Sequence, residues 1–72
     1  MSTFTDYLRK SRYLKMDNPR GDLANDILRD RSFPETDNLQ HISDYLQRQL
    51  DSQQWKDFLV LRRSFLRAQS KW

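Results

Sequence analysis

The residues whose type and spacing could do chemistry are cations near the carboxyl end of this 72-residue chain. At 100° of rotation per residue, a helix would bring four of them within about 80° of one another. These are Lys56, Arg63, Arg67 and Lys71. Such a row can lie along a nucleic-acid backbone, where each neutralised phosphate releases counterions. The commonest explanation of such a row is an ordinary solvated helix flank, and a contact with an acidic protein is a third alternative. The sequence leaves all three interpretations open.

The distribution of charge bears on the choice between these partners. Residues 1–21 carry a net charge of +3, residues 22–51 carry −4 and residues 52–72 carry +4. The first segment contains three cations that could assist nucleic-acid binding: Arg9, Lys10 and Arg12. Because the acidic middle dilutes the field that a polyanion would meet, net charge does not separate a nucleic-acid partner from an acidic protein. Opposed acidic and basic surfaces would also allow self-association.

Catalytic groupings are scarce in this composition. With one His, one Gly and no Cys, the chain can assemble neither a Ser-His-Asp grouping nor a glycine-rich phosphate loop. His41 points away from the apolar side of its helix, which predicts an exposed surface residue. Asp22, Asp26 and Asp30 are spaced four apart, but helical carboxylates supply too few oxygens for a Ca²⁺ shell. We therefore expect no enzyme activity, metal, cofactor or small-molecule substrate.

Arg62 is unusual because it lies in the middle of the apolar side of the last segment, next to Phe58 and Phe65. An unpaired guanidinium buried there would be costly. The side chain must therefore extend its charged end to solvent, meet a carboxylate or contact a partner. We favour an internal ion pair, with Asp30 as the candidate carboxylate.

The elements that must position these residues are all helical. Apolar residues recur at helical spacing, and no segment shows the alternation of a strand. We predict an all-α bundle in a single domain, residues 1–72, with helices at 4–14, 22–31, 38–49 and 52–69. The predicted N-terminal caps are Thr3, Asp22, Asp37 and Asp51. Pro19 and Gly21 predict a turn before the second helix, where Gly21 would permit a positive φ.

A corner between the second and third helices is built from Asp30, Phe33 and Pro34. Pro34 restricts Phe33 to extended backbone, so the preceding helix must end near Arg31. The proline therefore directs Phe33, and we expect its ring to fill the core. Asp30 either accepts backbone amide hydrogen bonds at this corner or pairs with an arginine.

The expected core is rich in aromatic side chains, each of which buries a large apolar area. Its predicted members are Phe4, Tyr7, Leu8, Leu23, Ile27, Leu28, Phe33, Ile42, Tyr45, Leu46, Trp55, Phe58, Leu59 and Phe65. On the last helix, Leu59, Arg62 and Leu66 are expected to share this apolar side. Trp72 is interpreted as a frayed end or a contact residue.

Several short motifs recur here in a recognisable order. They are Phe4-x-x-Tyr7-Leu8, Ala24-Asn25, Asp30-x-Ser32-Phe33-Pro34 and Ile42-Ser43-x-Tyr45-Leu46. Together they resemble the YozE-like family of small bacterial proteins with a SAM-like helical fold, over roughly residues 4–50. The resemblance implies a compact bundle of about four helices in a bacterial cytoplasm, with interaction rather than chemistry as its role. Residues 52–70, which we expect to form a basic helix, differ from the more acidic end of that family.

The longest apolar run, residues 58–61, is too short to span a bilayer, so we expect a cytoplasmic protein without membrane contact. We therefore predict a non-enzymatic interaction module, with nucleic acid bound through the basic carboxyl-terminal helix as its first hypothesis. The alternative is a protein–protein adaptor or a self-associating domain that uses opposed acidic and basic surfaces.

Overall fold

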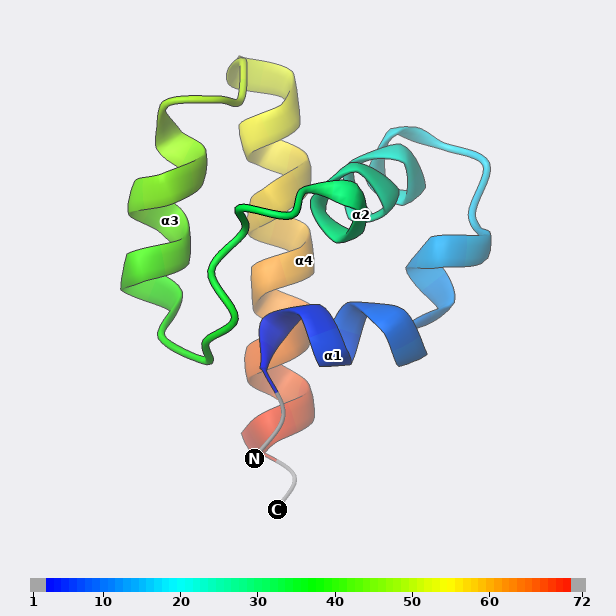
Figure 1. Ribbon diagram of the computed structural model, residues 1–72. Coiled ribbons are helices and arrows are strands. Elements are labelled where there is room, and N and C mark those ends of the chain that lie inside the picture. Colours follow the sequence, from blue (N-terminus) through cyan, green and yellow to red (C-terminus); the bar gives the residue numbers. More distant parts are fainter. Residues whose placement is uncertain (1–2, 71–72) are drawn as a thin grey trace.

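The computed structural model describes residues 3–70, and within that range the chain is helical and contains no strand (Figure 1). Its elements are α1 (Phe4–Lys10), the 3-10 helix η1 (Arg12–Lys15), α2 (Pro19–Arg29), α3 (Leu39–Gln47) and α4 (Ser52–Ser70). The predicted all-α class is confirmed. The predictions for Lys71 and Trp72 fall outside the described residues.

Helix α4 is the longest element, and the others pack around one side of it. Figure 1 shows α3 running antiparallel to α4 and α1 crossing the carboxyl-terminal half of α4. Helix α2 packs against both α4 and η1. The whole measures 32 × 26 × 21 Å. The opposite side of α4 is therefore left for solvent or for a partner.

Helix α1 is shorter than predicted. Thr3 caps it as expected, because its Oγ1 accepts a hydrogen bond from the Asp6 amide (3.2 Å) and Asp6 accepts one from the Thr3 amide (3.4 Å). The helix ends at Lys10, since Ser11 adopts extended backbone with ψ 157°. The Ser11 hydroxyl donates to the Leu8 carbonyl oxygen at 2.7 Å, which offers the backbone an alternative to the next helical turn. The predicted single helix over 4–14 is therefore wrong, and η1 follows as a separate turn.

Helix α2 begins earlier than predicted, at Pro19 instead of Asp22. Proline suits the first helical position, where its missing N–H would have had no partner. Asn18 is the cap, and its Oδ1 accepts from the Gly21 amide at 3.0 Å. Gly21 has no positive φ. It is needed for space instead, because an added Cβ would lie 2.0 Å from the carbonyl oxygen of Met16 in the connection before α2.

Helix α3 is capped by Asn38 instead of the predicted Asp37. The Asn38 Oδ1 accepts hydrogen bonds from the amides of Gln40 and His41 at 3.1 and 3.2 Å. The helix ends at Gln47, two residues before the predicted boundary.

The break before α4 is confirmed. Asp51 Oδ1 accepts from the Gln54 amide at 2.8 Å, and Gln54 Oε1 accepts from the Asp51 amide at 3.1 Å. This reciprocal pair is the predicted capping box.

Phe4 lies at the centre of the core and is fully buried. Its ring centroid is 6.4 Å from that of Phe33, 6.0 Å from Phe58 and 5.3 Å from Phe65. The contacts with Phe58 and Phe65 are edge-to-face, the arrangement that aromatic quadrupoles favour. The start of α1 is also tied to the loop before α3, since the Phe4 amide donates to the Thr36 carbonyl oxygen at 3.2 Å.

Most of the predicted core is confirmed. Nine predicted residues are buried: Phe4, Leu8, Leu23, Ile27, Phe33, Ile42, Leu46, Phe58 and Phe65. Four more are half-buried against them: Tyr7, Leu28, Tyr45 and Trp55. Leu59 is wrong, because 39% of it is exposed. The prediction missed Tyr13, Ala24 and Leu61, which are buried.

Candidate interaction surface

The predicted cations of α4 that the structure describes are all exposed. We call Lys56, Arg63 and Arg67 the cationic stripe. On a helix of 100° per residue they span about 40° and point away from the core-facing side of α4. That side is occupied by Phe58, Leu61 and Phe65. The stripe therefore faces outward over a length of about 16 Å at a rise of 1.5 Å per residue.

None of the stripe's cations is neutralised by a carboxylate within residues 3–70. The ion pairs in that range join Arg9 to Asp6 at 3.1 Å and Arg20 to Asp57 at 3.9 Å. Asp57 is the one carboxylate of α4, and it is buried on the side that faces α2. The outward side of α4 is consequently cationic without a local counter-charge.

The basic residues of the amino-terminal segment lie elsewhere on the molecule. Arg9, Lys10 and Arg12 are exposed, but Phe4 anchors α1 on the core-facing side of α4. Near the other end of this segment, the hydroxyls of Tyr13 and Ser64 lie 2.6 Å apart. These cations therefore belong to different elements from the stripe, and η1 reaches α4 at Ser64, the residue that follows Arg63.

Two leucines are exposed beside the stripe. Leu59 is 39% exposed and Leu66 is 46% exposed. The sequence interpretation placed them on the apolar side, but the buried side of α4 is centred on Leu61 instead. The buried side of α4 therefore lies closer to position 57 than the sequence predicted. Asp57 is at the edge of this buried side, where it pairs with α2. Exposed leucines next to cations give the outward side of α4 a mixed apolar and basic character.

Arg62 lies at the edge of this side and does not form the predicted ion pair. Its Nε is buried without a hydrogen-bond partner in the described chain, and the residue as a whole is half-buried. The candidate partner Asp30 is already engaged, because Oδ1 accepts from the Ser32 amide at 2.9 Å and Oδ2 accepts from the Tyr45 hydroxyl at 2.5 Å. The Arg62 side chain therefore reaches the surface along its apolar neighbours.

The contacts made at the corner of Asp30, Phe33 and Pro34 stabilise the fold by joining the end of α2 to α3. Phe33 is 5% exposed, and its ring meets that of Tyr45 edge-to-face at 5.5 Å. The hydrogen bond to the Asp30 carboxylate raises the pKa of the Tyr45 hydroxyl above its ordinary value. Asp30 thus accepts a backbone amide at the corner, one of the two roles expected of it, and also ties the end of α2 to α3.

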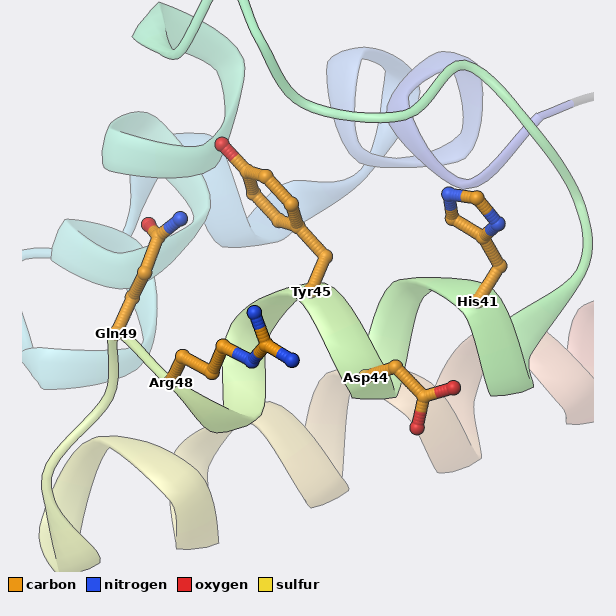
Figure 2. Close-up of a pocket in the computed structure, with 5 residues that line it drawn as sticks. All are labelled: His41, Asp44, Tyr45, Arg48 and Gln49. Carbon is orange, nitrogen blue, oxygen red and sulfur yellow. The ribbon is translucent and has the colours of Figure 1, made fainter.

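A shallow depression of about 460 Å³ lies along α3 (Figure 2). It is lined by His41, Asp44, Tyr45, Arg48 and Gln49. Figure 2 shows that these side chains project from α3 and from the turn that follows it, with Asp44 pointing away from His41 and Tyr45. The Asp44 carboxylate accepts a hydrogen bond from the side-chain amide of Gln40 at 3.0 Å instead. His41 is exposed, as predicted. Among these lining side chains, no acid and base point toward a common position, as an acid–base catalytic site would require.

The acidic row on α2 does not form a site in the described chain. Asp22 and Asp26 are exposed, and Asp30 is held at the corner. Within residues 3–70 no three His, Cys, Asp or Glu side chains gather in a way that could hold a metal ion. In the same range, no helix combines the length and the apolar character needed to cross a membrane.

A family model with the description YozE SAM-like fold matches residues 3–60. The match covers more than half of the chain and extends the resemblance noted over residues 4–50 into the first half of α4. Arg63 and Arg67 lie beyond the matched segment. The comparisons with curated proteins and with solved structures found no match.

Proposed function

The chain belongs to the YozE SAM-like family, and we propose that it is a non-enzymatic interaction module that binds an anionic macromolecule along the cationic stripe. One observation carries this proposal: the three stripe cations are exposed on one side of α4 and have no carboxylate partner within residues 3–70. Such a row keeps a positive potential that attracts anionic partners. A bacterial cytoplasmic setting, without membrane contact, is part of the proposal.

Nucleic acid is the first candidate for the anionic partner. Duplex DNA carries one charge per about 1.7 Å of its axis, so a stripe about 16 Å long can meet several phosphates. Three neutralised phosphates give a slope of about −2.7 for log affinity against log salt. Affinity should therefore fall about 40-fold between 50 and 200 mM salt, a change large enough to measure directly.

Fluorescence anisotropy of a labelled 20-bp duplex tests this candidate. We expect the double variant R63E/R67E to weaken binding strongly and to flatten the salt dependence. The control K10E/R12E makes the same change in net charge on α1 and η1, outside the stripe. It should weaken binding far less. Equal losses in the two variants would show that net charge, and not the stripe, holds the duplex.

An acidic protein is the second candidate, and the exposed leucines favour it. Phosphates give Leu59 and Leu66 nothing to pack against, whereas a protein surface can cover them. The partner could also be a second copy, if its exposed Asp22 and Asp26 met the stripe. Light scattering distinguishes this case, because an assembly held by such contacts dissolves between low and moderate salt. A monomer at all salt concentrations would exclude it.

A further inference from the structure

Four residues of α4 form a mixed apolar and basic ridge that shares Arg63 with the cationic stripe. We call Leu59, Arg62, Arg63 and Leu66 the leucine–arginine ridge. They are spaced i, i+3, i+4 and i+7, which places them on one side of a helix within about 100°. Leu59 and Leu66 are the exposed large hydrophobic residues of the described chain. They lie two turns apart, about 10.5 Å along the helix axis.

The arginine at the inner edge of the ridge lacks an acceptor. The Nε of Arg62 is buried without a hydrogen-bond partner in residues 3–70, and no carboxylate of that range lies within ion-pair distance of its guanidinium. The Nε itself is covered by the chain, so a partner's carboxylate can meet only the exposed part of this half-buried residue. Arg63, at the outer edge, is exposed and likewise without a carboxylate partner in the described chain.

The charges around the ridge select what can cover it. The flanking residues Lys56 and Arg67 add further positive charge, and the sole carboxylate of α4 faces α2. Two copies of the chain meeting through this ridge would place arginine against arginine, and like charges in an interface are destabilising. A nucleic acid would satisfy the cations but leave the leucines uncovered. A protein with both carboxylates and apolar side chains satisfies the two halves of the ridge together.

We propose that the leucine–arginine ridge docks an acidic amphipathic helix of a partner protein, with apolar residues one heptad apart and carboxylates beside them. A helix laid along α4 presents apolar residues at i and i+7, which matches the spacing from Leu59 to Leu66. Its carboxylates then meet Arg62 and Arg63. This inference rests on the proposed function, because it names the partner class for the same side of α4.

A pair of synthetic peptides tests the proposal on the full chain. The probe is a labelled 21-residue peptide with leucines at heptad positions and glutamates flanking them. The control peptide has the same composition in scrambled order and therefore the same charge. We expect the amphipathic peptide to bind at least tenfold more tightly than the scrambled one. In L59S/L66S the preference should disappear, with a loss of about fivefold for each half-exposed leucine and about 25-fold for both.

Two controls keep the result interpretable. Val60 is a half-buried apolar residue of α4 on the far flank of the stripe, so V60S should retain the preference for the amphipathic peptide. Far-UV circular dichroism checks that each variant stays helical. The wild-type chain supplies a separate readout, since the peptide should shift the backbone amide resonances of residues 59–66.

The outcomes separate this inference from the proposed function. If the scrambled peptide binds equally well, or if L59S/L66S has no effect, charge alone is recognised and the inference is overturned. If the duplex binds through the stripe while neither peptide binds, the inference also fails but the proposed function stands. If R63E/R67E changes the binding of neither peptide nor duplex, the proposed function itself fails.

Discussion

Replacing Gly21 by alanine should destabilise the protein, although alanine is the better helix former. Gly21 is in the first turn of α2, where helix propensity alone predicts a gain of up to about 1 kcal/mol for alanine. Packing acts in the opposite direction. The new Cβ would lie 2.0 Å from the Met16 carbonyl oxygen and 2.8 Å from that of Tyr13. Both are backbone atoms, so no side-chain rotation can relieve the contact.

The connection from η1 must therefore move away from α2. This movement also strains the contact between the hydroxyls of Tyr13 and Ser64, which holds η1 to α4 at 2.6 Å. Overpacking of this kind costs about 1–3 kcal/mol, and more where the backbone itself must shift. We expect a net loss of about 2 kcal/mol, which lowers the Tm of a domain of this size by about 8–16 °C.

Urea and thermal unfolding, followed by circular dichroism, measure this loss. Asp26 provides a matched control because it is an exposed position of the same helix. There D26A should be more stable than D26G by about 1 kcal/mol, the ordinary order of the two residues in a helix. The order should reverse at Gly21. A G21A protein as stable as the natural chain, or more stable, would refute the close approach of η1 to α2.

Three further predictions concern the corner and the caps. F33A should lose about 3–5 kcal/mol of unfolding free energy in urea, because a buried ring leaves a cavity, and a loss below 1 kcal/mol would contradict its burial. D51A should lose about 1 kcal/mol through the missing cap of α4, and an unchanged Tm would count against that cap. Stability should depend on alkaline pH through Tyr45, because the hydrogen bond to Asp30 raises the pKa of its hydroxyl. The contribution of this bond to the free energy of unfolding is complete below pH 10.0 and is lost as the pH rises through the pKa of the folded state. Thermal unfolding at pH 9 and pH 11 should show a smaller decline for Y45F than for the natural chain, and parallel declines would exclude the effect.

The sequence predicted elements well where local chemistry decides them. The cap at Thr3 and the reciprocal pair of Asp51 and Gln54 were predicted because each needs only residues three apart in sequence. Pro34 likewise fixed the direction of Phe33 through a local restriction. These features required no knowledge of the tertiary structure.

The errors arose where a distant segment decides the outcome. Gly21 suggested a turn, but its real role is to let the connection from η1 approach α2, and that contact is visible only in three dimensions. Leu59 and Leu61 are both apolar and two residues apart, so periodicity alone could not determine which is buried. The packing of α2 against the Asp57 side of α4 selects Leu61.

The candidate surface was predicted in part. The exposure of Arg63 and Arg67 followed from helical spacing, whereas their separation from Arg9 and Lys10 depends on which side of α4 receives α1. The sequence also could not show that Arg62 has no ion pair with Asp30. The Asp30 carboxylate accepts a hydrogen bond from Tyr45, which belongs to a different helix.

A ¹⁵N-HSQC titration of the full chain with the acidic amphipathic peptide would locate the docking surface residue by residue. We expect the amides that shift to belong to the outward side of α4, between Lys56 and Arg67, and those of α1 and η1 to stay unchanged. Shifts confined to α1 and η1, or spread evenly over every exposed cation, would contradict a docking surface on α4.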